Sequence, residues 1–152
     1  MQRELRPSDE DGFTLIEILV VVAIIGLLMT YLATNLLGQA AGAKIDLARV
    51  QMEKLEQTLE LYKLDNGRYP TSEQGLNALV SAPTSEPLPR RYPPKGYVKR
   101  ADLEDPWGVK YQYVAPGSRN TFSFDLFSFG PDGIQGGEAE NADIGNWDTQ
   151  SG

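Results

Sequence analysis

One uncharged apolar stretch near the N-terminus limits what this chain of 152 residues can fold into. No charged residue occurs from Ile18 to Leu37, and about 20 residues of helix span about 30 Å, the thickness of the hydrocarbon layer of a membrane. A cleaved secretory signal has an apolar region of roughly 7–15 residues with small residues at its cleavage site. This run is longer and has no such site after it, so the sequence favours a retained membrane helix.

A single carboxylate, Glu17, stands directly before this run. A charged group at the centre of a membrane helix costs about 2.5–3.5 kcal/mol on insertion scales, and such groups normally face a cation or a protein interior. Cleavage between Gly12 and Phe13 would give Phe13 a free amino group one helical turn from Glu17. Because pairing of the acid with that amine, in the same chain or a neighbour, would set the register between packed helices, we expect Glu17 to be an assembly residue.

A second apolar pattern predicts that the helix continues beyond the membrane. Apolar residues recur at spacings of three and four, as on one face of an amphipathic helix; they are Ile45, Ala48, Met52, Leu55, Leu59 and Tyr62. The helix is expected to end at Asp65-Asn66-Gly67. A continuous helix from Phe13 to Leu64 would be about 78 Å long; two helices joined at Gly38–Gly42 are the alternative.

The residues after this helix are expected to form a small head. Thr71-Ser72-Glu73-Gln74 fits a capping box that opens a short helix reaching Val80. Six of the ten prolines fall between Pro83 and Pro106, which indicates an irregular, exposed segment. Two β-rich runs, 109–114 and 121–129, predict an antiparallel hairpin that packs on the apolar face of the helix.

Four parts with different compositions therefore follow one another along the chain. Residues 1–12 form a short polar segment, 13–37 the membrane helix, 38–65 its amphipathic continuation and 66–152 the head. The predicted fold class is α+β, with a long N-terminal helix packed on a small antiparallel sheet.

The second β-rich run, TFSFDLFSF, changes the face on which its large side chains lie. Phe122, Phe124 and Leu126 alternate on one side, whereas Phe127 and Phe129 have the opposite parity. Either the strand contains a bulge or both faces of the sheet are covered.

Charge and composition argue against several classes of function. The net charge of −7 opposes binding to nucleic acid. A chain without Cys has no disulfide, and a chain without His lacks the commonest general base and imidazole ligands for zinc. The basic residues of the Pro-rich segment are better explained as a solvated loop that meets the acidic surface of a like subunit; they are Arg90, Arg91, Lys95, Lys99 and Arg100. We expect neither an enzyme nor a nucleic-acid partner.

An acidic, glycine-rich stretch, GPDGIQGGEAENADIGNW, follows the second β-rich run. Its glycines make the backbone compliant, and its acidic and amide side chains supply hard oxygens. Calcium takes about six to eight such oxygens at flexible geometry, although the spacing is not that of an EF-hand. On composition alone, a solvated mobile turn and a calcium loop both stay open.

At the N-terminus, Gly12-Phe13-Thr14-Leu15-Ile16-Glu17 followed by an apolar helix resembles the class III leader of type IV pilins and pseudopilins. The resemblance implies cleavage between Gly12 and Phe13 by a prepilin peptidase on the cytoplasmic face, and N-methylation of Phe13. It also implies that Glu17 guides assembly against the N-terminus of a neighbouring subunit. Leaders of this family usually carry Lys or Arg just before the glycine, whereas this chain has Asp9-Glu10-Asp11.

Further motifs resemble the major pseudopilins of the type II secretion system, and the match runs from Gly12 to about Trp147. They are DNGRYP at 65–70, EQGL at 73–76, DPWG at 105–108, YQY at 111–113 and the glycine-rich end at 130–147. The resemblance implies a structural Ca2+ in the C-terminal loop. Its implied ligands are the side chains of Asp132 and Asp143, the carbonyl of Phe129, and oxygens from Glu140 and Asn141.

The function that this resemblance implies is structural. Subunits would polymerise into a periplasmic pseudopilus that drives folded proteins through an outer-membrane channel. The chain would be a single-pass protein of the bacterial inner membrane with its head in the periplasm. Expected partners are further copies of the chain, minor pseudopilins, the prepilin peptidase and an inner-membrane assembly platform, with the outer-membrane secretin and secreted proteins as indirect partners.

Two alternatives stay open at this point. The first is a major subunit of a surface type IV pilus, which the calcium-type loop and the absence of cysteine disfavour. The second is a membrane-anchored periplasmic hydrolase that uses an acidic pair such as Asp132 and Asp143.

Overall fold

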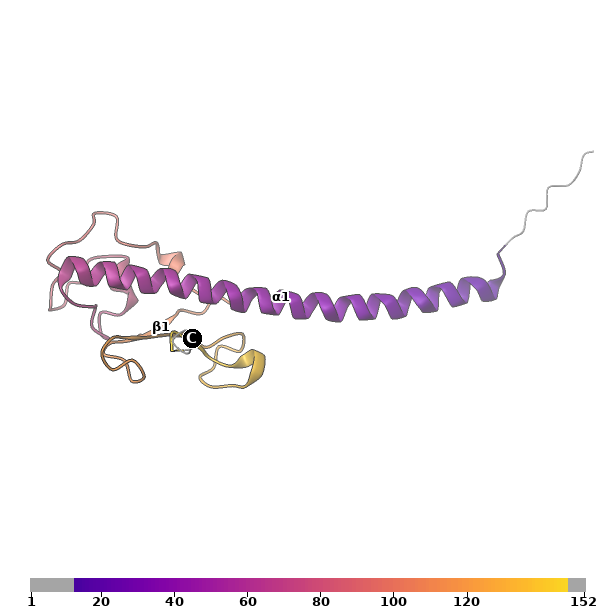
Figure 1. Ribbon diagram of the computed structural model, residues 1–152. Coiled ribbons are helices and arrows are strands. Elements are labelled where there is room, and N and C mark those ends of the chain that lie inside the picture. The colour runs from indigo at the N-terminus through magenta and orange to yellow at the C-terminus, as the bar shows by residue number, and fades with distance from the viewer. Residues whose placement is uncertain (1–12, 148–152) are drawn as a thin grey trace, which may run out of the picture. The chain divides into compact units, whose positions relative to one another are not determined.

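The structure is a computed structural model that describes residues 13–147, with side chains throughout this range except at 34–37 and 140. One helix, α1 (Leu15–Asn66), precedes a head made of short elements (Figure 1). These are the 3-10 helices η1 (Leu76–Leu79), η2 (Arg100–Leu103) and η3 (Ala139–Asn141) and the strands β1 (Gln112–Val114), β2 (Asp125–Ser128) and β3 (Ile144–Gly145). Between Gln39 and Ala40, within α1, the chain divides into two compact units.

One face of α1 supplies five of the fourteen buried residues in the core of the second unit. Ala48, Met52, Leu55, Leu59 and Tyr62 are each at most 3% exposed. They join the apolar side chains of the head in one buried cluster, which includes Leu76, Leu79, Leu103, Tyr111, Phe124, Leu126 and Ile144. The predicted amphipathic face and its packing on a small antiparallel sheet are therefore confirmed (Figure 1).

The helix ends where its sequence predicts. The backbone remains helical through Gly38 and Gly42, as the single-helix prediction requires, and α1 stops at Asn66. Gly67 follows with φ of 78°, a left-handed conformation that glycine adopts without steric cost, and its N–H donates to the carbonyl of Lys63 at 2.6 Å.

The sheet is smaller than predicted and has one strand more. β2 lies between β1 and β3, and both pairings are antiparallel. The two β-rich runs form strands only at 112–114 and 125–128. Lys110 forms an isolated bridge with Glu104, and the N–H of Tyr111 donates to the carbonyl of Leu103 at 3.0 Å, so the start of the first run pairs outside the sheet. Asp105 accepts hydrogen bonds from the N–H groups of Trp107 and Val109 at 3.0 and 2.9 Å, which forms a turn at the start of the first run.

Both faces of β2 are covered, which is one of the two predicted explanations of its parity change. Leu126 is fully buried in the core cluster, whereas Phe127 lies on the opposite face between Phe129 and Trp147, at ring-centroid distances of 5.6 and 5.5 Å. The pairing of β1 with β2 runs residue by residue without a bulge. Phe122, expected on one side of the strand with Phe124 and Leu126, lies before β2, which begins only at Asp125, and its ring is fully exposed.

The capping box at Thr71 and Gln74 is present, although it does not open an α-helix. The N–H of Thr71 donates to the Gln74 side chain at 3.1 Å, and the N–H of Gln74 donates to the Thr71 hydroxyl at 3.1 Å. A turn closed by Gly75 follows, and the predicted helix to Val80 is the 3-10 helix η1. The Gln74 carboxamide also donates to the carbonyls of Ser85 and Pro87, which holds the Pro-rich segment against the head.

Candidate functional site

The first candidate site is the N-terminal end of α1, where Glu17 already has a partner in its own chain. Thr14 precedes the first helical residue, and its N–H and hydroxyl both donate to the Glu17 carboxylate, at 3.2 and 3.3 Å. The N–H of Glu17 donates back to the Thr14 hydroxyl at 3.3 Å. This is a capping box. The sequence signal for it, Thr-x-x-Glu directly before an apolar run, was present but not used in the prediction.

The surroundings of this capping box are apolar and open. Phe13 is 80% exposed. The large apolar side chains from Leu15 to Leu32 are likewise exposed, and within the described residues α1 is the one helix long and apolar enough to cross a membrane. Gly12, the predicted cleavage residue, lies outside the described residues. Cleavage after it and methylation of Phe13 stay predictions.

The second candidate site is the glycine-rich loop between β2 and β3, where glycines allow the chain to fold back tightly. Gly130 and Gly137 have φ of 72° and 92°. A Cβ at Gly137 would lie 2.2 Å from the carbonyl oxygen of Asn141, and one at Gly130 would lie 3.2 Å from the carbonyl oxygen of Ala142. The close approach of carbonyl oxygens to the chain at both positions therefore requires glycine.

The predicted calcium ligands occupy different environments in this loop. Asp143 accepts a hydrogen bond from the N–H of Gly136 at 3.0 Å with one oxygen, while its other oxygen, Oδ1, is buried without a hydrogen-bond donor. Asp132 is exposed and accepts from the N–H of Ile134 at 3.1 Å. Asn141 lies in η3 with its side chain exposed, and the Phe129 ring packs on Phe127. The side chain of Glu140 lies outside the described residues.

These residues fit a hard cation in part. A buried carboxylate oxygen without a donor is the environment that a cation satisfies. Within residues 13–147, as far as their side chains are described, no three carboxylates gather in a group that could hold a metal. Carbonyl oxygens, as at Phe129 and Asn141, would have to supply much of the coordination.

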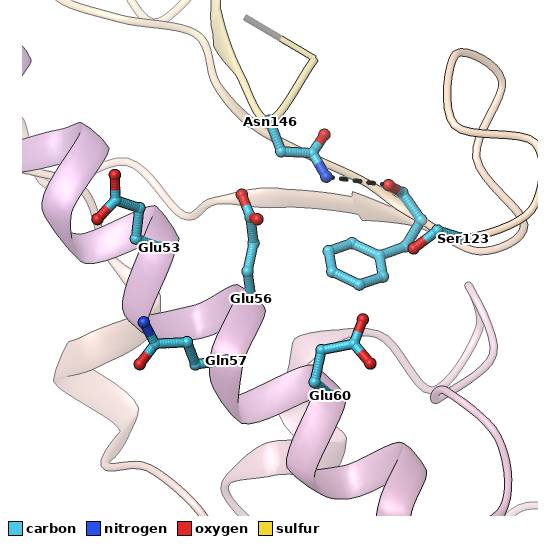
Figure 2. Close-up of a pocket in the computed structure, with 7 residues that line it drawn as sticks. Glu53, Glu56, Gln57, Glu60, Ser123 and Asn146 are labelled. Atoms are coloured by element: carbon cyan, nitrogen blue, oxygen red, sulfur yellow. Dashed lines mark hydrogen bonds between the residues drawn. The ribbon is translucent and has the colours of Figure 1, made fainter. Parts of the chain in front are cut away.

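A third feature is an acidic groove of about 310 Å³ between α1 and the loop before β2. Figure 2 shows Glu53, Glu56 and Glu60 along α1, with Ser123 and Asn146 across from them. Burial, followed by the negative charges of Glu53 and Glu60, raises the pKa of Glu56 above its ordinary value of 4.5.

The acidic pair of the hydrolase alternative has a structural role. Asp132 and Asp143 each accept a hydrogen bond from a loop N–H group and shape the turns in which they lie. Neither aspartate lines the acidic groove. Asp143 lines a different pocket, of about 250 Å³, and Asp132 does not line it, so the two aspartates do not work together there.

Two family models match adjoining parts of the chain and together cover most of it. Residues 35–147 match the family model described as type II secretion system (T2SS), protein G, and residues 7–33 match the prokaryotic N-terminal methylation motif. The chain belongs to the type II secretion system protein G family. The methylation motif spans Gly12, Phe13 and Glu17, the residues singled out by the charge argument.

Several relatives of this family member are closely similar over nearly their full length. Type II secretion system core protein G of Vibrio cholerae is 49% identical over 93% of this chain and 94% of its own length. The protein of the same name from Pseudomonas aeruginosa is 45% identical over 95% of this chain and 100% of its own length.

A solved structure supports the fold. It is the crystal structure of the major pseudopilin from the type 2 secretion system of enterohaemorrhagic Escherichia coli, with 47% identity and a TM-score of 0.64. The match covers 75% of this chain and 95% of that one. The predicted resemblance to pseudopilins is confirmed.

Proposed function

We propose a route by which this T2SS protein G is processed, anchored and assembled. Membership of the family makes the chain a structural subunit of the type II secretion pseudopilus, not an enzyme. The surface-pilus and hydrolase alternatives are therefore set aside. The route itself depends on one observation, the Thr14–Glu17 capping box at the start of an exposed apolar helix.

In this proposal the capping box keeps Glu17 satisfied while the subunit is still in the membrane. Two neutral donors from Thr14 bind the carboxylate, so the acid enters the apolar layer with part of its hydrogen bonding satisfied although it keeps its charge. Cleavage after Gly12 gives Phe13 a free amino group. The carboxylate of Glu17 then pairs with the Phe13 amino group of a neighbouring subunit. A charge pair in an apolar surrounding is strong and directional, so it fixes the axial register of packed helices.

The same proposal fixes the place of the chain and its partners. α1 anchors the subunit in the inner membrane, and the head lies in the periplasm. A prepilin peptidase processes the leader, an inner-membrane platform assembles the processed chains together with minor pseudopilins, and the secretin and secreted proteins are indirect partners.

The experiment replaces the acid by an uncharged residue of the same shape. In cells that lack their own copy, Glu17→Gln should be processed normally but should form few filaments and secrete little protein, because no charge answers the amine. Mass spectrometry of the mature N-terminal peptide should find Phe13 first in the chain with one methyl group. Filaments of Glu17→Gln at the parental level, or a mature chain that still begins at Met1, contradict the proposal.

We also propose that Ca2+ binds the glycine-rich loop. The unpartnered Oδ1 of Asp143 supports this assignment, with Asp132, the Phe129 carbonyl, and oxygens of Glu140 and Asn141 completing the ligands. The ion would hold together a loop that has no disulfide. A ligand that binds only the folded state stabilises that state by about 2.7 kcal/mol when the ligand concentration is one hundred times Kd.

Thermal unfolding of the chain in Ca2+ and in EDTA tests this second proposal. Tm should be higher in Ca2+, and the difference should vanish in Asp143→Asn, whereas replacement of the exposed Glu73 by Gln should keep it. An equal Tm of the parent chain in Ca2+ and EDTA removes the proposal.

A further inference from the structure

We propose that Asp105 and Ser128 are positioning residues for Ca2+, because together they orient the carbonyl of Phe129 toward which the ion would bind. Neither side chain is itself one of the proposed ligands. The inference rests on the calcium site of the proposed function, and it connects the turn at 105–108 with the glycine-rich loop through two buried side chains.

A chain of hydrogen bonds runs from Asp105 to the start of the glycine-rich loop. The Ser128 hydroxyl donates to one oxygen of the Asp105 carboxylate at 2.5 Å, and the hydroxyl oxygen accepts from the N–H of Gly130 at 3.0 Å. The other oxygen of Asp105 accepts from the N–H groups of Trp107 and Val109 at 3.0 and 2.9 Å. The carboxylate is therefore fixed by its own turn and holds Ser128 in place.

Burial makes this chain of hydrogen bonds rigid. Asp105 is 5% exposed and Ser128 is 0% exposed, so water does not compete for their bonds. A hydrogen bond to an ionised acceptor is also stronger than one between neutral groups. Such a buried pair supports the fold of the head as well, so a positioning role needs a direct connection to the metal site.

The planarity of the peptide bond supplies this connection. The N–H of Gly130 and the carbonyl of Phe129 belong to one peptide unit, and in the trans form they point in opposite directions. Holding the N–H on the Ser128 hydroxyl therefore fixes the direction of the carbonyl. Gly130 has φ of 72° and no side chain to restrict its backbone, so the direction of this peptide depends on that hydrogen bond.

The sheet brings the oriented carbonyl to a second proposed ligand. Ser128 pairs with Ile144 in the antiparallel register of β2 and β3, and the same register one residue further places Phe129 across from Asp143. Asp143 carries the buried Oδ1 that has no hydrogen-bond donor. A carbonyl with a fixed direction beside this oxygen reduces the rearrangement that metal binding requires, and outer partners of this kind typically change metal affinity by about 10–100-fold.

The test is a Ca2+ titration of the full-length chain in detergent by isothermal titration calorimetry, with Ser128→Ala as the main variant. Tyr113→Phe is the matched control, because the Tyr113 hydroxyl donates to the carbonyl of Pro70 at 2.8 Å, away from the glycine-rich loop. Both variants should lower Tm in EDTA, since each loses an internal hydrogen bond. Ser128→Ala alone should weaken the Kd for Ca2+, by about tenfold, and the rise of Tm in Ca2+ should shrink with it.

Asp105→Asn is a second variant that preserves the size of the side chain. Its carboxamide oxygen can still accept from Trp107 and Val109, whereas its NH2 group replaces the oxygen that accepts from Ser128. The Kd for Ca2+ should weaken, but less than in Ser128→Ala, because the Ser128 oxygen remains available to the N–H of Gly130.

Two outcomes overturn the inference. One is a parental Kd in Ser128→Ala, or in Asp105→Asn where Ser128→Ala does not unfold cooperatively. The other is an equal loss of affinity in Tyr113→Phe, because Kd would then follow the stability of the head in general. A parent chain that binds no Ca2+ would instead contradict the proposed calcium site, and the inference with it.

Discussion

At the scale of single residues, buried polar side chains hold the loops of the head, because they bind backbone N–H and carbonyl groups that have no partner in a helix or strand. The Asp125 carboxylate accepts from the N–H groups of Ser118, Arg119 and Asn120 at 2.6, 2.9 and 2.9 Å. Asn146 accepts from the N–H of Leu126 at 3.2 Å and donates to the carbonyl of Phe124 at 3.1 Å. Such groups fix loops that have little regular structure, because a buried polar group without a partner costs about 1–3 kcal/mol.

Glu56, unlike these polar groups, destabilises the folded subunit when its side chain is ionised. Its pKa is raised in the folded state by burial and by Glu53 and Glu60, so folding is opposed by its ionisation. The cost is present at pH values above the folded pKa and is lost as the pH falls below the unfolded value of 4.5. We expect Glu56→Gln to raise Tm at pH 7 and to leave it unchanged at pH 4.

Melting curves at the two pH values measure this difference directly. The exposed Glu73→Gln is the matched control and should leave Tm unchanged at both. A Glu56→Gln chain that is no more stable than the parent at pH 7 would show that the groove accommodates three charges without penalty.

At the scale of elements, the end of α1 and the Pro-rich segment are joined through one carboxamide. Asn66 donates to the carbonyl of Tyr62 at 3.0 Å and to the hydroxyl of Tyr97 at 3.4 Å, and it accepts from the N–H of Arg91 at 3.0 Å. Asn66 is 1% exposed, so water does not replace these bonds. Together with Gln74 and Arg68, which donate to carbonyls of the same segment, Asn66 thus fixes the course of the Pro-rich segment.

Replacing Asn66 by Ala should therefore loosen a segment that is distant in sequence. We expect a loss of about 1–3 kcal/mol in the free energy of unfolding, together with faster amide exchange at Arg91. Hydrogen exchange read by mass spectrometry checks this, with the exposed Asn77→Ala as control. Unchanged exchange around Arg91 in Asn66→Ala would contradict the role given to this carboxamide.

What the sequence could predict at this scale follows from the range of each interaction. The core face of α1 and its stop at Gly67 depend on local spacing and backbone preference, and both were predicted. The two-residue strand β3 was missed because it carries no periodic signal and depends on pairing with β2, which is remote in sequence. The adjacent Asn146 reinforces this pairing by accepting from the N–H of Leu126. The predicted start of the second strand at residue 121 failed for a similar reason, since Asp125 binds the preceding loop and the strand begins only there.

In the candidate sites too, local sequence identified some features and only the fold revealed the others. Glu17 was identified from the energetic cost of a charge beside an apolar run, a property of the local sequence. Its capping by Thr14 was readable from the Thr-x-x-Glu pattern. In the glycine-rich loop, composition indicated hard oxygens, but only the fold distinguishes the unpartnered Oδ1 of Asp143 from the exposed carboxylate of Asp132.

At the scale of the whole molecule, the division at Gln39 and Ala40 separates two tasks. Every residue of the buried cluster lies after Ala40, from Ala48 to Ile144, whereas the large apolar residues from Phe13 to Leu32 are all exposed. The second unit therefore contains its own core, and the first carries the exposed apolar surface of the helix that is long enough to cross a membrane.

A fragment that begins at Ala40 should then fold by itself as a soluble monomer, because it loses no core contact. We expect it to unfold in one cooperative transition, to keep the stabilisation by Ca2+ that is proposed for the full chain, and to form no filaments at any concentration tested. Calorimetry, sedimentation and electron microscopy measure these three properties. A fragment that unfolds without a cooperative transition would mean that the core depends on residues before Ala40, and a fragment that forms filaments would remove the need for the capped Glu17 in assembly.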